Sequence, residues 1–282
     1  MKNLWHNLKG NYSAIISILF IILLITSAVF SKQIAPHDPM SQDLMSRLKP
    51  PFWMDGGSFN NPLGTDHLGR DLFSWLIYGA RISLVISFLA VVLSGVIGGV
   101  LGLFAGYYGG LIDDIIMRFV DIQMAFPFIL LALILLSVMG SGFINIVIVL
   151  SLTNWFYYAR LVRSEVLNIK SSQFVEAAKA IGVSDIGIIF KHIAPNVINS
   201  LIILATLRTA SVVLLESALS FLGLGIQEMP TWGVALANGR HYLNNAWWLA
   251  TFSGLSIFFT ILSVNLVGDW LRDVSDPHLN NL

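Results

Sequence analysis

Residues 82–106 read ISLVISFLAVVLSGVIGGVLGLFAG, an apolar run without one charged side chain. A helix needs about 20 such residues to cross roughly 30 Å of hydrocarbon, so this stretch predicts a membrane-spanning helix. The rest of the chain agrees, because 56% of its residues are hydrophobic and only 11% are charged. Soluble domains carry charge on about a quarter of their residues. The sequence therefore predicts an all-α integral membrane protein.

Further apolar runs bring the expected number of transmembrane helices to about six. They lie at 12–31, 122–140, 143–163, 197–222 and 249–268. The first run follows Lys2 and Lys9, is too long for the core of a cleaved signal and precedes no small-residue cleavage pattern, so it predicts a retained anchor. We expect residues 1–81 to form this anchor helix and an external loop, and residues 82–282 to form a five-helix core.

Lysine and arginine are unevenly distributed between the segments that join these runs, which orients the chain. If the N-terminus is cytoplasmic, the inner segments receive nine of them: Lys2, Lys9, Arg118, Arg160, Arg163, Lys170, Lys179, Lys191 and Arg272. The outer segments then receive six: Lys32, Arg47, Lys49, Arg70, Arg81 and Arg240. Both termini are therefore expected in the cytoplasm. The external loop is expected to end in a short amphipathic helix over 70–78.

The internal loop at about 166–196 has the local chemistry of two short helices. Gly182 stands where a helix C-terminus favours a residue free to adopt positive φ. Ser184 or Asp185 can cap a second helix, which Pro195 is expected to stop. Apolar residues recur at helical spacing before the glycine and predict one apolar stripe. They are Phe174, Ala177, Ala178 and Ile181. Such a structure needs a partner surface, because it is too short to fold alone.

This loop resembles the EAA loop of ATP-binding-cassette (ABC) importer permeases at Glu176-Ala177-Ala178, at Gly182 and at Ile193-Ala194-Pro195. It departs from that loop at Ala194, where the family often has leucine. The resemblance implies a type I ABC importer permease fold, in which a coupling helix over 171–181 sits in a cleft of the nucleotide-binding subunit. The residues that it assigns to coupling with the ATPase are Phe174, Glu176, Ala177, Ala178, Ile181, Gly182 and Pro195.

Four other segments resemble permeases of the dipeptide, oligopeptide and nickel group, specifically the "C" type of its two permease subunits. They are LGTDHLGRD at 63–71, AGYYGG at 105–110, SFLGLG at 220–225 and NLVGD at 265–269. The resemblance implies transport of short peptides, and nickel or a metal chelate stays open as an alternative. An ion-gradient-driven secondary transporter is the alternative of another class. It would predict inverted repeats and acidic residues at the membrane midplane, and no clear repeat is visible in the sequence.

The same resemblance implies the partners of the chain. They are a second homologous permease, two nucleotide-binding ATPase subunits, an extracytoplasmic solute-binding protein and the lipid bilayer of a bacterial or archaeal plasma (inner) membrane. The sequence has no phosphate-binding loop of the Gly-x-x-x-x-Gly-Lys-Ser/Thr kind, so the chain is expected not to be an enzyme. ATP and Mg would be bound by the ATPase subunits, with no cofactor or metal in this chain. Zero net charge gives no indication of nucleic acid.

Arg208 lies inside the run 197–222, where a charge facing lipid costs at least about 2.5–3.5 kcal/mol. It therefore faces protein or water, either along a translocation path or beside a buried structural partner. Glu216 lies eight residues further on the same face, too far for direct contact with Arg208, and has the same two interpretations.

Three further patterns predict contacts. Glycines at four-residue spacing predict close helix packing, within the bundle or against a second permease. They are Gly98, Gly102, Gly106 and Gly110. The i, i+3 spacing of Arg118 and Asp121 predicts a local ion pair. The tryptophans of 223–248 are expected to be interfacial anchors. They are Trp232, Trp247 and Trp248.

Overall fold

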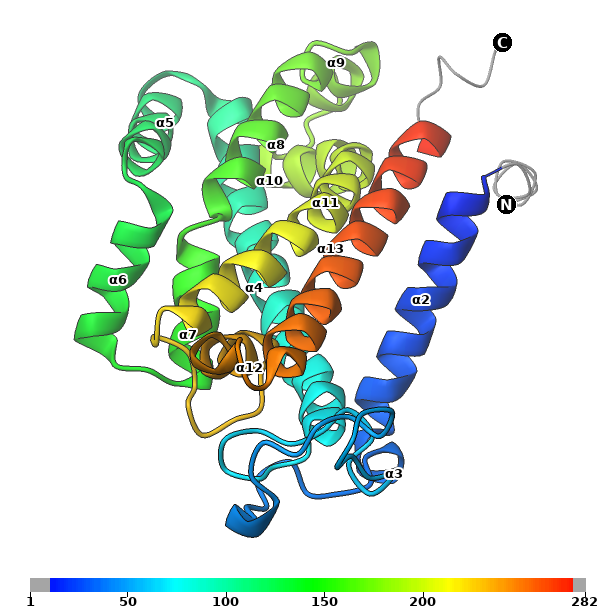
Figure 1. The fold of residues 1–282 in the computed structure, drawn as a ribbon. Coiled ribbons are helices and arrows are strands. Elements are labelled where there is room, and N and C mark those ends of the chain that lie inside the picture. The colour runs from blue at the N-terminus through cyan, green and yellow to red at the C-terminus, as the bar shows by residue number, and fades with distance from the viewer. Residues whose placement is uncertain (1–10, 276–282) are drawn as a thin grey trace.

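The computed structural model describes residues 11–275, and its regular structure over this range is helical, with a single isolated β-bridge between Thr65 and Asp71. Figure 1 shows the arrangement. The longer helices are α2 (Tyr12–Val29), α4 (Leu72–Tyr108), α5 (Gly110–Ala125), α6 (Phe128–Met139), α7 (Phe143–Leu152), α8 (Trp155–Ile169), α11 (Ala194–Phe221) and α13 (Trp247–Ser275). The shorter ones are α3 (Ser31–Ile34), α9 (Gln173–Ala180), α10 (Asp185–Gly187) and α12 (Trp232–Gly239), with single turns at Leu44–Ser46 and Arg240–Tyr242 and a π-helix over Ile188–Ile193.

Four helices of the described chain are long and apolar enough to cross a membrane: Tyr12–Val29, Leu72–Tyr108, Asp185–Phe221 and Trp247–Val274. A fifth crossing results if α5 and α6 count as one span bent by 96°. The bend follows from Pro127, which disfavours helical backbone in Phe126 and leaves that residue extended at φ −88° and ψ 129°. The run at 143–163 is likewise divided, into α7 and α8. The count of six spans therefore stays a prediction.

Helix α4 begins earlier than the sequence predicted. Asp71 caps it by accepting a hydrogen bond from the backbone N–H of Ser74, at 2.8 Å, and the helix then continues without a break to Tyr108. The separate amphipathic helix expected over 70–78 is therefore wrong. The expected division of the chain at residue 81 falls inside α4.

Glycines let α4 lie directly against α8. A Cβ on Gly102 would stand 2.6 Å from the carbonyl oxygen of Ala159, and one on Gly106 would stand 2.7 Å from the Cβ of Val166. Gly98 faces α8 in the same way, next to Trp155 and Tyr158. The predicted packing of these glycines is confirmed and lies within the bundle. Gly110 takes no part in it, because a Cβ there would have no neighbour within 4 Å.

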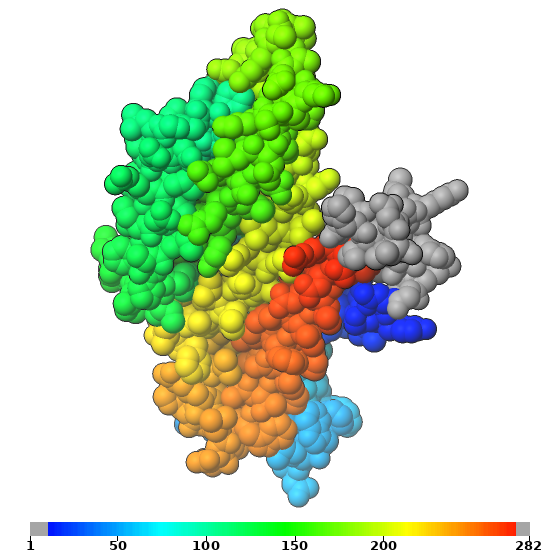
Figure 2. Space-filling view, turned by 90° about the horizontal axis from the view of Figure 1, so that it is seen from above, coloured from blue at the N-terminus to red at the C-terminus, as the bar shows by residue number. Residues whose placement is uncertain are grey.

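The helices place the two loops at opposite ends of the bundle. Figure 1 shows α9 at the same end as the start of α2 and the end of α13, whereas α3 and α12 lie at the other end. Viewed from the α9 end in Figure 2, α2 lies at one edge beside α13, and the green segments of α5–α8 lie along the other edge. This arrangement is consistent with the predicted topology, in which the loop at 166–196 lies on one side of the membrane and the loop at 32–71 lies on the other.

We expect both termini to be cytoplasmic, with six spans. A reporter enzyme fused near residue 60 should be active only outside the membrane, and one fused near residue 175 only inside, because the lysine and arginine distribution places these loops on opposite faces. Activity of both fusions on one side would contradict the topology.

Candidate functional site

Residues 171–193 fold into a compact helical knob at one end of the bundle. Its first helix, α9, ends in a Schellman motif. The N–H of Val183 bonds to the carbonyl of Ala178 at 3.1 Å, and that of Gly182 to the carbonyl of Lys179 at 3.0 Å. Gly182 has φ +83°, which confirms the positive φ expected there.

The second half of the knob continues into a membrane helix. Ser184 caps α10 by accepting from the N–H of Gly187, at 3.3 Å, as predicted. The expected stop at Pro195 is wrong, because Pro195 is the second residue of α11, directly after a π-helix, and the helix continues through it. The preceding π-helix shifts the register, so that the N–H of Ala194 bonds to the carbonyl of Ile189. Helical structure therefore runs from Asp185 to Phe221.

The apolar residues of the knob divide between two faces, not the single stripe that the sequence predicted. Ala178 is buried together with Val175, which the sequence analysis missed because it stands outside the proposed spacing. These two pack with residues of α4, α8 and the π-helix: Leu103, Tyr107, Val162, Val166, Ile188, Ile189 and Ile193. The knob is thus fixed to the bundle by an apolar core of its own.

Four large apolar side chains of the knob are exposed instead of buried. We call this set the knob surface, and it consists of Phe174, Ile181, Ile186 and Phe190, which are 46%, 81%, 62% and 46% exposed. Ala177, Glu176, Gly182 and Pro195 are also exposed. Isolated apolar residues are common on protein surfaces, but four on one small projection indicate an interaction site.

Polar contacts hold the knob against the C-terminal end of α4. Tyr107 donates a hydrogen bond from its hydroxyl to Asp185, at 2.5 Å, and the ammonium of Lys179 lies 5.1 Å from the centre of the Tyr107 ring. Lys170 donates to the carbonyl of Gly106 at 3.2 Å. The knob is therefore joined to α4 by side-chain contacts as well as to α11 by continuous helix.

Ion pairs join α5 to α8. Arg163 donates to both carboxylate oxygens of Asp113, from Nε to Oδ1 and from Nη2 to Oδ2 at 2.6 Å, and Arg160 pairs with Asp121 at 2.8 Å. The predicted pair of Arg118 with Asp121 is therefore wrong, because Asp121 reaches across to α8 instead of along its own helix.

Arg208 lies near the middle of α11 and lines a cavity of about 330 Å³. Its guanidinium stacks 3.1 Å from the centre of the Tyr157 ring, a cation–π contact that partly compensates the cost of a charge in the membrane. The other walls come from α5, α6, the α7–α8 break, α8 and α11: Gln123, Met124, Phe126, Phe128, Leu131, Thr153, Asn154, Phe156, Ser211, Leu214 and Leu215.

Glu216 lies elsewhere, in the packed interior between α4 and α11. It is 1% exposed and accepts hydrogen bonds from Ser83 at 3.1 Å and Ser220 at 2.9 Å. It does not line the cavity of Arg208. The structure therefore separates the two charged residues that the sequence placed on one helix face.

Two of the three tryptophans are not interfacial anchors. Trp232 and Trp248 are 1% and 2% exposed and donate hydrogen bonds to the carbonyls of Leu76 and Thr65. Trp232 therefore joins α12 to the first turns of α4, and Trp248 joins α13 to the loop that precedes α4. Trp247 is 39% exposed.

The sequence matches the family described as binding-protein-dependent transport system inner membrane component over residues 98–281, and the N-terminal transmembrane domain of oligopeptide transport permease C over residues 1–51. It is 40% identical to the di/tripeptide transport system permease protein DppC of Pseudomonas aeruginosa (strain UCBPP-PA14), over 100% of this chain and 93% of that one.

The dipeptide transport system permease protein DppC of Escherichia coli (strain K12) is 42% identical over 99% of this chain and 93% of that one. The glutathione transport system permease protein GsiD of Shigella flexneri serotype 5b (strain 8401) is 42% identical over 98% and 89%.

Among solved structures, an inward-facing conformation of the MetNI methionine ABC transporter covers 72% of this chain and 97% of its own, with a TM-score of 0.57 and 20% identity. This likeness shows the fold alone. Together with the matches in sequence, it places the helical bundle described above among known permeases. The chain belongs to the family of binding-protein-dependent transport system inner membrane components, the permeases of ABC importers.

Proposed function

We propose that this chain is one of two permease subunits of an ATP-driven importer that moves short peptides across the inner membrane of a bacterium. The knob surface is the observation that carries the proposal, since its four exposed apolar side chains need a partner. The three relatives are named for dipeptides, tripeptides and glutathione, and this favours peptides over nickel or a metal chelate.

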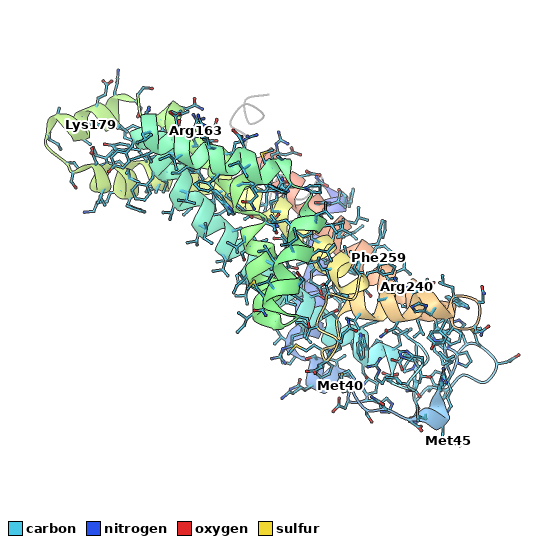
Figure 3. The ribbon with its side chains drawn as sticks, turned by 90° about the vertical axis from the view of Figure 1, so that its left-hand side faces the viewer. Met40, Met45, Arg163, Lys179, Arg240 and Phe259 are labelled. Carbon is cyan, nitrogen blue, oxygen red and sulfur yellow. The ribbon has the colours of Figure 1, made fainter. Side chains whose placement is uncertain are left out.

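The partners in this proposal are a second permease, two ATPase subunits and an external solute-binding protein. The ATPase subunits bind ATP and Mg and dock on the knob, while the binding protein delivers the peptide at the opposite end of the bundle. Figure 3 supports this division, because Lys179 of α9 and Met45 of the outer loop lie at opposite ends of the molecule.

In the proposed mechanism, ATP binding closes the ATPase pair and displaces the two knobs. The knob is part of the same helical segment as α11, and Tyr107 connects it to α4. The displacement therefore reaches α11, which lines the Arg208 cavity, and differential contacts with the ATPase in its two states bias inward or outward access. Arg208 lines the path, whereas the buried Glu216 joins α4 to α11.

The proposal is tested with the complex purified from its host membrane and reconstituted in vesicles with ATP and the binding protein. We expect ATP-dependent uptake of a labelled dipeptide and co-purification of the ATPase subunits. Glutathione and Ni²⁺ are the comparison substrates. Uptake of Ni²⁺ without peptide would contradict the substrate, and uptake driven by an ion gradient without ATP would contradict the transporter class.

A further inference from the structure

Arg208 is a charged residue inside the bundle that has no ion-pair partner among residues 11–275. It stands 14 residues after the start of α11, about 20 Å along the helix. The three ion pairs found within residues 11–275 do not include it, and its guanidinium makes no hydrogen bond there. Its one close electrostatic contact is the Tyr157 ring.

The cavity around Arg208 has no acidic side chain in its walls. Its polar members are mostly engaged with the backbone: Thr153 and Asn154 donate to carbonyls of α7, and Gln123 donates to the carbonyl of Leu152. Arg208 therefore carries the only charge of the lining, and its N–H donors are free to bind an anion that enters.

We propose that Arg208 binds the terminal carboxylate of the peptide during its passage, an inference that rests on the proposed function. A guanidinium offers five N–H donors in a planar fork that matches a carboxylate with two parallel hydrogen bonds. The Tyr157 ring, whose centre lies 3.1 Å from the Cζ of Arg208, helps to hold the guanidinium in place, and the N–H donors of the group are in no ion pair within residues 11–275.

Because the lining has no acidic residue, the site distinguishes the two ends of a peptide. A peptide carries an ammonium at one end and a carboxylate at the other, and this cavity complements only the carboxylate. The carboxylate of an acidic side chain on the second permease is the competing source of the same chemistry. The experiment must therefore separate a carboxylate on the substrate from one on the partner.

The test compares a dipeptide with its C-terminal amide in the reconstituted complex, for the wild type, Arg208→Gln and Arg208→Lys. The binding protein is saturated with each ligand beforehand. We expect Arg208→Gln to lower dipeptide uptake at least 10-fold and to leave amide uptake at the wild-type rate. Arg208→Lys should give an intermediate result, because it keeps the charge and loses the fork. Arg118→Gln, which removes an exposed arginine outside the cavity, is the matched control.

A second measurement does not depend on delivery by the binding protein. Phenylglyoxal modifies accessible arginines, and we expect millimolar dipeptide, but not its amide, to protect Arg208 in the complex while Arg118 reacts in both samples. An equal loss of dipeptide and amide uptake in Arg208→Gln would overturn the inference. So would phenylglyoxal modification of Arg208 at the same rate with and without dipeptide. Neither result would contradict peptide transport by the wild-type complex. A wild-type complex that moves no peptide would overturn the proposed function as well.

Discussion

Replacing Ile181 by aspartate is expected to weaken binding of the ATPase subunits by about 10- to 100-fold. Ile181 is 81% exposed in the isolated chain, and burying an isoleucine side chain contributes about 1.5–3 kcal/mol, which corresponds to that range of affinity. The permease itself should still insert, since the side chain has little contact with its own bundle. Titration of the purified permease pair with ATPase subunits measures the effect.

Met45→Asp is the matched control for this change. Met45 is 92% exposed and lies at the opposite end of the molecule (Figure 3), so its replacement should leave ATPase affinity unchanged. Equal affinity of wild type and Ile181→Asp would mean that the knob surface does not hold the ATPase.

Gly182→Ala is also expected to weaken binding of the ATPase subunits, by less than Ile181→Asp does. The new Cβ would meet no atom within 4 Å, so the change acts through the φ of +83° alone, at a cost of about 1–2 kcal/mol. Gly223→Ala is the matched control, because Gly223 closes the same kind of Schellman motif at the C-terminal end of α11, at φ +86° and also without neighbours within 4 Å. Loss of ATPase affinity in the first variant only would locate the effect in the knob.

Gly98→Ala is expected to reduce the amount of folded permease severely. The added Cβ would lie 2.7 Å from the Cβ of Tyr158 and closer still to the carbonyl oxygen of Trp155. The carbonyl oxygen belongs to the backbone and cannot move to another rotamer as a side chain can, so α4 and α8 must move apart. Overpacking of this kind costs about 1–3 kcal/mol or more. Thermal unfolding in detergent and the yield from membranes measure it.

Gly254→Ala provides the control, because it is also a glycine within a membrane helix and its Cβ would meet nothing within 4 Å. We expect this variant to be as stable as the wild type or slightly more stable, since alanine favours helix by about 1 kcal/mol over glycine. Comparable losses in both variants would show that glycine itself, and not the α4–α8 contact, determines stability.

Features set by local chemistry could be predicted from the sequence. The positive φ of Gly182 and the cap by Ser184 need only a helix end and a helix start, and both are found. The glycine spacing of α4 likewise predicts close packing, because small residues at one helical face leave room for a backbone. Family motifs supplied the fold and the transporter class.

Features set by tertiary contacts could not be predicted. Spacing alone grouped Ala178 with Ile181, although one faces Val162 and Val166 and the other faces outward. Asp121 has a possible partner on its own helix in Arg118, but it forms its ion pair with Arg160 of α8. The separation of Arg208 from Glu216 depends on which helices surround each, and no pattern within one helix specifies that.

The passage of helix through Pro195 has a mechanical consequence. From Ile186 to Arg208 the chain advances about 33 Å at 1.5 Å per residue, with no loop between them to absorb movement. In the proposed mechanism this segment acts as a lever arm, in which a tilt applied at the Ile186 end swings the Arg208 guanidinium sideways in proportion to the length of the segment.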